Sequence, residues 1–134
     1  MDSALNLSTV YKKYVQAIQD HDLDEMSKYV SDKVVLNGRH LGLEGYRNLV
    51  LNSIIRTNLQ IGLKRLMSEG NHVAVLAVFT TTPSTKGLLG MELDGTVFSY
   101  TQNVFYDFED GKIIEVYSLT DTDAIKAHAR HPRP

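Results

Sequence analysis

Apolar residues in the first 57 positions recur with the spacing of α-helices. After a possible cap at Ser8, a stripe of apolar side chains along residues 9–20 predicts a helix: Val10, Tyr14, Ala17 and Ile18. Asp22 can cap a second short helix that ends near residue 29, and residues 43–57 carry a third helical stripe. Between them, residues 31–32 are predicted to form a turn and residues 34–36 a brief strand that ends before Gly38.

The pattern changes to that of β-strands after residue 58. Strands are predicted over residues 59–68, 72–82, 96–108 and 112–120, with turns at 69–71 and 109–111, a glycine-bearing loop over 83–94 and a short last helix over 121–129. Helices followed by strands predict one α+β domain over residues 1–134. We expect a curved antiparallel sheet wrapped around three N-terminal helices, with a conical cavity between them that binds a ligand.

Composition narrows the classes of function. The chain has 134 residues, 43% of them hydrophobic, and no cysteine, so it can bury a core but cannot form a disulfide or a thiolate metal site. The net charge is −2 with both signs interspersed, which argues against nucleic-acid binding. Without paired-histidine spacings, phosphate loops, a signal peptide or a long apolar run, we expect no metal, no cofactor and no membrane contact, and a cytoplasmic protein.

Alternation along the closing strand sets one mixed face apart. Ile113, Glu115, Tyr117, Leu119 and Asp121 share this face. If it borders the cavity, apolar surroundings would raise the pKa of Asp121 and make it a proton carrier near neutral pH. The alternative is that Asp121 caps the last helix, and on the residues alone the cap is favoured, because Asp is common at helix starts.

The preceding strand raises the same question about its facing. Asn103, Phe105 and Asp107 share a face. Asp107 would form a carboxylate pair with Asp121 if it pointed inward, or would lie in water near the hairpin end. Asn103 is the more informative residue, because Asn is rare in strands and a buried amide needs hydrogen-bond partners that a polar ligand could supply.

Other candidates lie at the edge of the expected cavity. Arg39 could stabilise an oxyanion and His40 could carry a second proton. Tyr14 and Tyr46 lie on helix faces and are interpreted as core. Apolar walls could come from Phe79, Met91, Phe105 and Leu119.

Three stretches together resemble the SnoaL-like polyketide cyclases of the nuclear-transport-factor-like superfamily. They are His40-Leu-Gly-Leu-Glu-Gly-Tyr46, Glu69-Gly-Asn-His-Val-Ala-Val75 and Phe108-Glu-Asp-Gly-Lys-Ile-Ile-Glu115, the last followed by Asp121. The resemblance implies a cone-shaped barrel, a homodimer formed through the sheet, and cofactor-free acid/base chemistry on a polyketide-like or terpenoid-like molecule. It also places the family's acid/base aspartate on Asp121.

The chain departs from this family at several positions. It has Tyr117 where such cyclases often have Trp, Thr80-Thr-Thr-Pro83 in place of a Gly-Thr-His, and no His near residues 36–37. The usual His-assisted aldol chemistry is therefore in question. Either Arg39, His40 or Asp107 substitutes for the histidine, or the reaction differs and is a ring closure by oxygen attack, an epoxide opening or a skeletal isomerisation.

Three hypotheses follow. In the first, the protein is a cyclase or isomerase in which Asp121 moves the proton, Arg39 stabilises negative charge, and further side chains orient the substrate: Asn103, Tyr117 and His40. In the second, it is a non-catalytic ligand-binding and dimerisation module, with an aliphatic-filled pocket and Asp121 in solvent. In the third, it is an epoxide-opening hydrolase, which requires Asp107, Asn103 and Arg39 to meet around one point.

Overall fold

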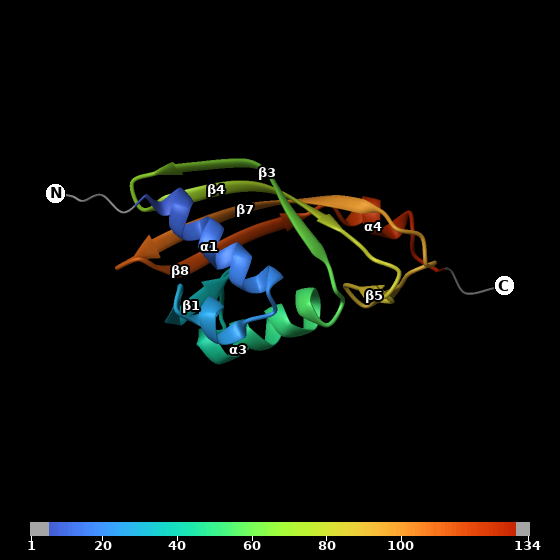
Figure 1. Ribbon diagram of the computed structural model, residues 1–134, viewed down its shortest axis with the longest axis horizontal. Coiled ribbons are helices and arrows are strands. Elements are labelled where there is room, and N and C mark those ends of the chain that lie inside the picture. Colours follow the sequence, from blue (N-terminus) through green and yellow to red (C-terminus); the bar gives the residue numbers. More distant parts are fainter. Residues whose placement is uncertain (1–5, 131–134) are drawn as a thin grey trace.

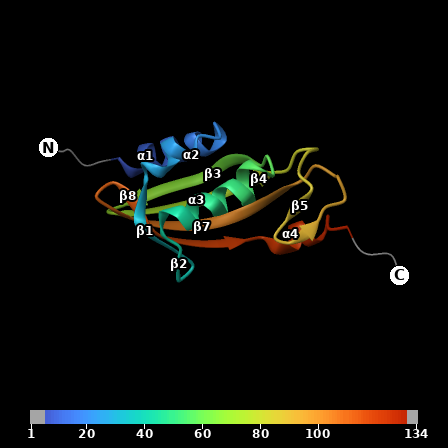
Figure 2. The ribbon, with the colours of Figure 1, turned by 90° about the horizontal axis from the view of Figure 1, so that it is seen from below.

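Helices from the first half of the chain pack against one face of a curved sheet (Figures 1 and 2). The computed structural model describes residues 6–130. The helical layer contains α1 (Leu7–Gln19), α2 (Leu23–Ser27) and α3 (Gly42–Val50), which runs directly into a π-helical segment, η1 (Leu51–Ile55). A short helix, α4 (Thr122–Lys126), follows the last strand. This is the α+β architecture that the sequence predicts.

The main sheet has six strands in the order β2-β1-β8-β7-β4-β3. Their bounds are β1 (Val30–Leu36), β2 (Arg39–His40), β3 (Gln60–Glu69), β4 (His72–Thr80), β7 (Ser99–Glu109) and β8 (Lys112–Thr120). The meander of four long strands confirms the prediction. The sheet is mixed rather than wholly antiparallel, because β8 returns alongside β1 in the same direction.

A second, two-stranded sheet lies in the segment predicted as a loop. It consists of β5 (Gly87–Leu88) and β6 (Met91–Glu92), which pair antiparallel. We call residues 87–92 the strap, because they cross one end of the space between the helices and the main sheet (Figure 2). The strap is therefore positioned to border any ligand that enters from that end.

Local capping and turn chemistry explain most element ends. Asn6, rather than Ser8, caps α1, and Asp22 caps α2 as predicted, accepting from Glu25 N at 3.0 Å. Asp110 and Gly111 have φ of 53° and 77°, as a two-residue hairpin turn requires. The turn predicted at residues 31–32 is wrong: these residues lie within β1, where a register shift between Val30 and Val35 absorbs them.

The sheet has a buried inner face and a more exposed outer face. Val73, Val75, Ala77 and Phe79 of β4 are buried and alternate with partly buried outer residues. On β7 the even-numbered positions point inward, beginning with Tyr100 and ending with Phe108. The inner face is therefore the one that meets the helices.

A β-bulge changes the facing along β8. Asp107 pairs with Glu115 and Phe108 with Ile113, so Ile114 is the extra residue. Both Ile113 and Val116 are consequently buried, at 0% and 2% exposure, although three residues separate them. Beyond the bulge, the even-numbered residues of β8 lie on the inner side.

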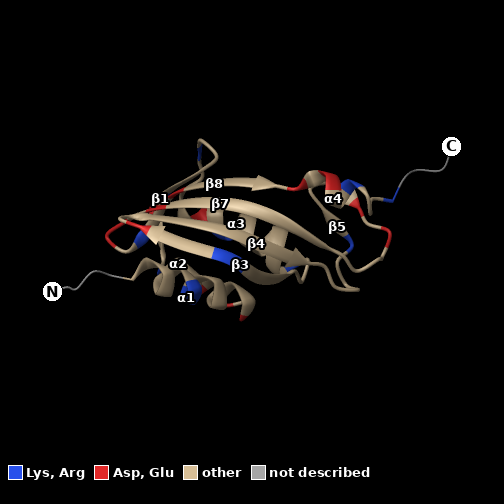
Figure 3. Ribbon diagram, turned by 90° about the horizontal axis from the view of Figure 1, so that it is seen from above, with Lys and Arg blue, Asp and Glu red and all other residues tan. Residues whose placement is uncertain are grey.

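Charged residues of both signs are distributed mainly over the turns, the helices and the ends of strands (Figure 3). No helix in the described part of the chain is long and apolar enough to cross a membrane.

Candidate functional site

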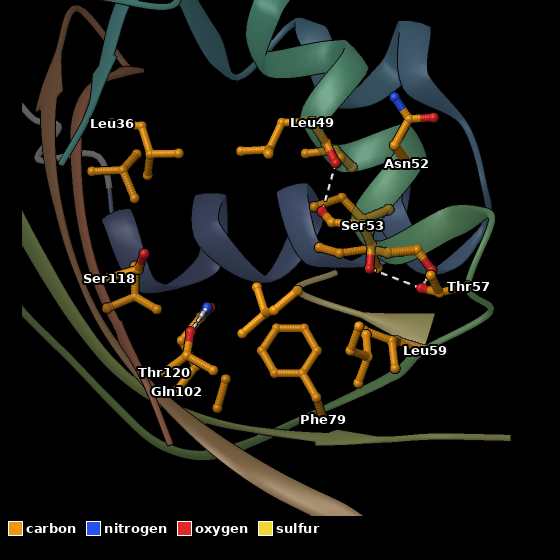
Figure 4. Close-up of a pocket in the computed structure, with 18 of the residues that line it drawn as sticks. Leu36, Leu49, Asn52, Ser53, Thr57, Leu59, Phe79, Gln102, Ser118 and Thr120 are labelled. Atoms are coloured by element: carbon orange, nitrogen blue, oxygen red, sulfur yellow. Dashed lines mark hydrogen bonds between the residues drawn. The ribbon is translucent and has the colours of Figure 1, made fainter. Parts of the chain in front are cut away.

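A cavity of about 940 Å³ lies between the helical layer and the inner face of the sheet (Figure 4). Its lining comes from α1, α3, η1, the inner faces of β4, β7 and β8, and the strap. This volume falls within the range of small-molecule sites, about 300–1,000 Å³. A cavity between the helices and the sheet, as predicted from the order of elements, is therefore present.

Much of the cavity wall is apolar. Leu36, Leu49, Leu59 and Phe79 point into it from four different elements or their connections (Figure 4). The ring of Phe79 stacks on that of Tyr100, with centroids 5.5 Å apart and an interplanar angle of 14°. The two rings form a flat patch suited to contact with a planar, apolar part of a ligand.

Two polar side chains pair on the sheet side of the cavity. Gln102 Nε2, on β7, donates to Thr120 Oγ1, on β8, at 2.9 Å (Figure 4). This leaves the Gln102 carbonyl and the Thr120 hydroxyl proton available to other groups. The sheet wall can therefore offer a ligand both an acceptor and a donor.

The opposite wall contains a π-helical turn. In η1 and just beyond it, Ser53 Oγ donates to the Leu49 carbonyl at 2.5 Å, and Thr57 Oγ1 donates to the Ser53 carbonyl at 2.8 Å. Asn52 and Ser53 are among the cavity-lining residues. π-Helical turns are rare and are frequently found at functional sites. The third helix, predicted to be continuous to residue 57, thus changes its winding where it borders the cavity.

Four tyrosines, which we call the tyrosine cluster, lie together in the cavity lining. Tyr11 and Tyr14 come from α1, Tyr46 from α3 and Tyr106 from β7. The Tyr14 and Tyr46 hydroxyl oxygens are 2.6 Å apart, and those of Tyr11 and Tyr106 are 3.1 Å apart. Burial raises the pKa of Tyr46 to about 12 and raises the pKa of the other three above its ordinary value. All four therefore remain neutral hydroxyls at physiological pH.

Charged groups are sparse in the lining. Among the described residues, Arg39 and Glu92 are the basic and the acidic side chain that line the cavity, and both are exposed. Arg39 lies on the two-residue strand β2 and Glu92 in the strap. The cavity interior is therefore neutral.

Three of the residues predicted for the site line this cavity: Arg39, Phe79 and Met91. His40 follows Arg39 in β2 but is exposed and is not part of the lining. The core interpretation of Tyr14 and Tyr46 is correct as to burial, yet both also line the cavity.

Asp121, which the family resemblance indicates as the acid/base residue, does not line the cavity. Its side chain is exposed, and Oδ1 accepts from Ala124 N at 3.2 Å as the N-cap of α4. The residue before it, Thr120, is the one that lines the cavity. Asp121 thus has the placement of the helix-cap alternative.

Five further residues predicted for the site lie on the outer face of the sheet: Asn103, Phe105, Asp107, Tyr117 and Leu119. The predicted facing failed because the even-numbered residues of β7 are the inner ones and the bulge at Ile114 places Val116 and Thr120 inward on β8. Asp107 Oδ1 instead lies 2.7 Å from His72 Nδ1 on this outer face.

Sequence reasoning did not identify Tyr11, Tyr106, Gln102 and Thr120 as cavity residues. One signal was available: the even-numbered positions of residues 98–108 hold four of that strand's five aromatic residues, and such a concentration favours the buried face. The hydroxyl contacts join α1 to β7 and α1 to α3, and their formation depends on tertiary packing that no local pattern shows.

Comparison with known proteins finds a matching family model and similar solved structures. Residues 8–128 match the family model described as SnoaL-like polyketide cyclase. A crystal structure of a SnoaL-like polyketide cyclase from Agrobacterium tumefaciens is 30% identical, with a TM-score of 0.82, covering 95% of this chain and 98% of that one. No curated protein matches the chain.

More distant solved structures share the fold. Wild-type IdmH, a putative polyketide cyclase from Streptomyces antibioticus, is 18% identical with a TM-score of 0.78, covering 91% of this chain and 96% of that one. A putative ketosteroid isomerase from Kribbella flavida is 16% identical with a TM-score of 0.63, covering 96% of this chain and 82% of that one.

Proposed function

Because the chain belongs to the SnoaL-like polyketide cyclase family, we propose that it is a cofactor-independent cyclase or isomerase that acts by acid/base chemistry on a polyketide-like or terpenoid-like molecule. The open cavity of about 940 Å³ is the observation that carries this proposal. Its walls are mostly apolar, and its polar groups come from the tyrosine cluster and the Gln102–Thr120 pair. Such a site suits a largely apolar molecule with a few oxygen functions.

Acid/base chemistry of this kind needs a proton carrier and a group that stabilises negative charge. Arg39, which is charged at any physiological pH, supplies the second function at the cavity edge. Two carboxylates are candidates for the first: Asp121, which the family resemblance indicates, and Glu92, which lines the cavity. The variants Asp121→Asn and Glu92→Gln distinguish the two candidates, because the variant that lacks the proton-carrying carboxylate loses most of its turnover.

The activity can be tested without knowing the substrate. A panel of polyketide and terpenoid ketones would be incubated with the protein and followed by chromatography and mass spectrometry. A cyclase or isomerase yields a product of unchanged mass and altered retention, and it incorporates solvent deuterium at carbons next to a carbonyl. A panel that shows neither change with any compound contradicts the proposal.

A matched pair of variants tests whether turnover occurs in the cavity. Ala77 is buried and lines the cavity, whereas its neighbour Val78 is on the outer face of the same strand. Ala77→Phe fills part of the cavity and is expected to reduce turnover at least tenfold, whereas Val78→Phe places the same side chain outside it and should have little effect. Equal activities in the two variants would place the reaction elsewhere.

A non-catalytic ligand-binding module is the second candidate. The observation that favours it is the exposure of Asp121, whereas the open cavity differs from the aliphatic-filled pocket expected for such a module. In the same assay, retention of compounds without chemical change would support this alternative.

The structure does not show the arrangement of side chains that the epoxide-opening alternative requires. Asn103 and Asp107 lie on the outer face of the sheet and Arg39 lines the cavity, so the three do not surround one point. The assay still detects this activity, because epoxide opening by water adds the mass of one water molecule to the product.

We also propose that the outer face of the sheet mediates a homodimer. Large apolar side chains gather there: Met67 is 65% exposed, Phe105 60%, Tyr117 49% and Leu119 72%. Strand pairing makes them neighbours, since Phe105 is opposite Tyr117 and, through Ala74, in register with Met67. A patch of this kind on a protein surface commonly marks an interface.

A further inference from the structure

The tyrosine cluster has more hydroxyl protons than its hydroxyl–hydroxyl hydrogen bonds use. Each tyrosine supplies one proton, and each of the two hydroxyl pairs, Tyr14–Tyr46 and Tyr11–Tyr106, uses one of its two protons in the bond between its members. A further contact between the Tyr14 and Tyr106 hydroxyls would use one more proton and would still leave one free. Within residues 6–130, no backbone carbonyl or carboxylate accepts a hydrogen bond from these four hydroxyls.

This surplus proton lies in a buried environment. The four tyrosines are only 3–6% exposed, yet all four are in the lining of the cavity. Buried hydroxyls in folded proteins almost always have a hydrogen-bond partner. Because all four tyrosines line the cavity, the missing acceptor is expected to be an atom of the molecule that occupies it.

The chemistry of the cluster restricts what that atom can be. Burial raises the pKa of each hydroxyl, so the cluster stays protonated and donates over the whole physiological range. A neutral donor in an apolar cavity favours an oxygen with free lone pairs, above all one on which negative charge develops. A cationic or purely hydrocarbon ligand would leave the donor unpaired.

We propose that the tyrosine cluster binds the carbonyl oxygen of a ketone substrate, with the substrate's flat apolar part against the Phe79–Tyr100 stack. This inference rests on the proposed function and deepens it, because it names the substrate class and the group that polarises the substrate. Enolisation of such a ketone places negative charge on the oxygen that the cluster holds, so the same hydrogen bonds strengthen as the reaction proceeds.

A binding experiment with a simple ketone tests the inference. The probe is 1-tetralone labelled with ¹³C at the carbonyl, and tetralin serves as the analogue of the same shape without oxygen. Two double variants each remove both hydroxyls of a pair: Tyr14→Phe/Tyr46→Phe and Tyr11→Phe/Tyr106→Phe. Tyr29→Phe is the matched control, because Tyr29 lies outside the cavity lining and has no hydroxyl contact with the cluster.

We expect the carbonyl ¹³C resonance of 1-tetralone to move downfield on binding to the wild-type protein and to Tyr29→Phe, as hydrogen bonding to a carbonyl requires. At least one double variant should lose this shift and bind 1-tetralone roughly 3–10-fold more weakly, the loss that corresponds to one net hydrogen bond. Affinity for tetralin should change in none of the variants.

Three outcomes of the binding experiment would overturn the inference: no binding of 1-tetralone to the wild-type protein, binding without the downfield shift, or a shift that survives in both double variants. If a double variant does not fold, Tyr46→Phe or Tyr106→Phe is measured in its place. The result is independent of turnover. Carbonyl binding without product formation refutes the proposed function alone, and turnover sensitive to Ala77→Phe but not to the cluster variants refutes the inference alone.

Discussion

The buried tyrosines predict that the protein loses stability in alkaline solution. The pKa of Tyr46 is raised from 10.0 to about 12 by burial. Between these two values the unfolded chain releases the Tyr46 proton and the folded chain keeps it, so the free energy of unfolding falls as the pH rises. This contribution is fully present below pH 10 and is lost as the pH rises through about 12. Two pKa units correspond to about 2.7 kcal/mol for Tyr46 alone.

Removing one hydroxyl pair isolates the effect. In Tyr14→Phe/Tyr46→Phe two raised titrations disappear, since burial also raises the pKa of Tyr14. Above pH 10 the wild-type protein should therefore lose up to about 2.7 kcal/mol more per pH unit than this variant, from two protons at about 1.4 kcal/mol each. At neutral pH the two should differ little, because replacing both partners of a buried hydrogen bond by apolar groups is nearly neutral.

Urea unfolding followed by far-ultraviolet circular dichroism at pH 8, 9, 10, 10.5 and 11 measures this difference. The subtraction of variant from wild type cancels the titration of lysines and other groups common to both. Tyr29→Phe is the control, because Tyr29 is only partly buried and lies outside the tyrosine cluster. Parallel stability curves for the wild-type protein and Tyr14→Phe/Tyr46→Phe up to pH 11 would refute the assignment of raised pKa values to this pair.

Two further predictions concern residues outside the cavity. Asp121→Ala should lower the free energy of unfolding by about 0.5–2 kcal/mol through loss of the α4 cap, measured by urea unfolding; an unchanged midpoint would show that the cap contributes nothing. Phe105→Lys should convert the proposed homodimer to a monomer in analytical ultracentrifugation while the circular dichroism spectrum stays the same, with Lys13→Ala on α1 as the control. A wild-type protein that is monomeric at micromolar concentration would contradict the dimer.

Most of the fold was predictable from the sequence because its determinants are local. The stripe beginning at Val10, the cap at Asp22 and the Asp110-Gly111 turn are each recognised within a few residues. The parallel pairing of β1 with β8 was not predictable in this way. It joins segments about 80 residues apart, and β1 is short enough that its alternation does not show its partner.

The site was less predictable because it depends on which side of a strand faces the helices. Arg39, Phe79 and Met91 were placed correctly. Arg39 follows the brief first strand, Phe79 lies in an evidently buried strand and Met91 lies in the glycine-bearing segment. The polar residues of β7 and β8 were placed on the wrong side. A polar residue in a strand can indicate either a buried site or an exposed face, and only the aromatic alternation of the partner strand distinguishes the two.

The bulge at Ile114 shows why spacing from a turn does not transfer a catalytic role. Counting in twos from Ile113, which is fully buried, places Asp121 inward, and this is the facing that the strand pattern suggested. The bulge adds one residue, so Val116 and Thr120 face the cavity and Asp121 reaches the end of the strand on the outer side, where it caps α4. A residue-by-residue match to a relative is therefore reliable along β8 only where the relative has a bulge at the same position. Asp121→Asn measured beside Glu92→Gln tests this directly, because loss of turnover in Asp121→Asn alone would require the carboxylate to leave its cap and act from the outer side of the strand.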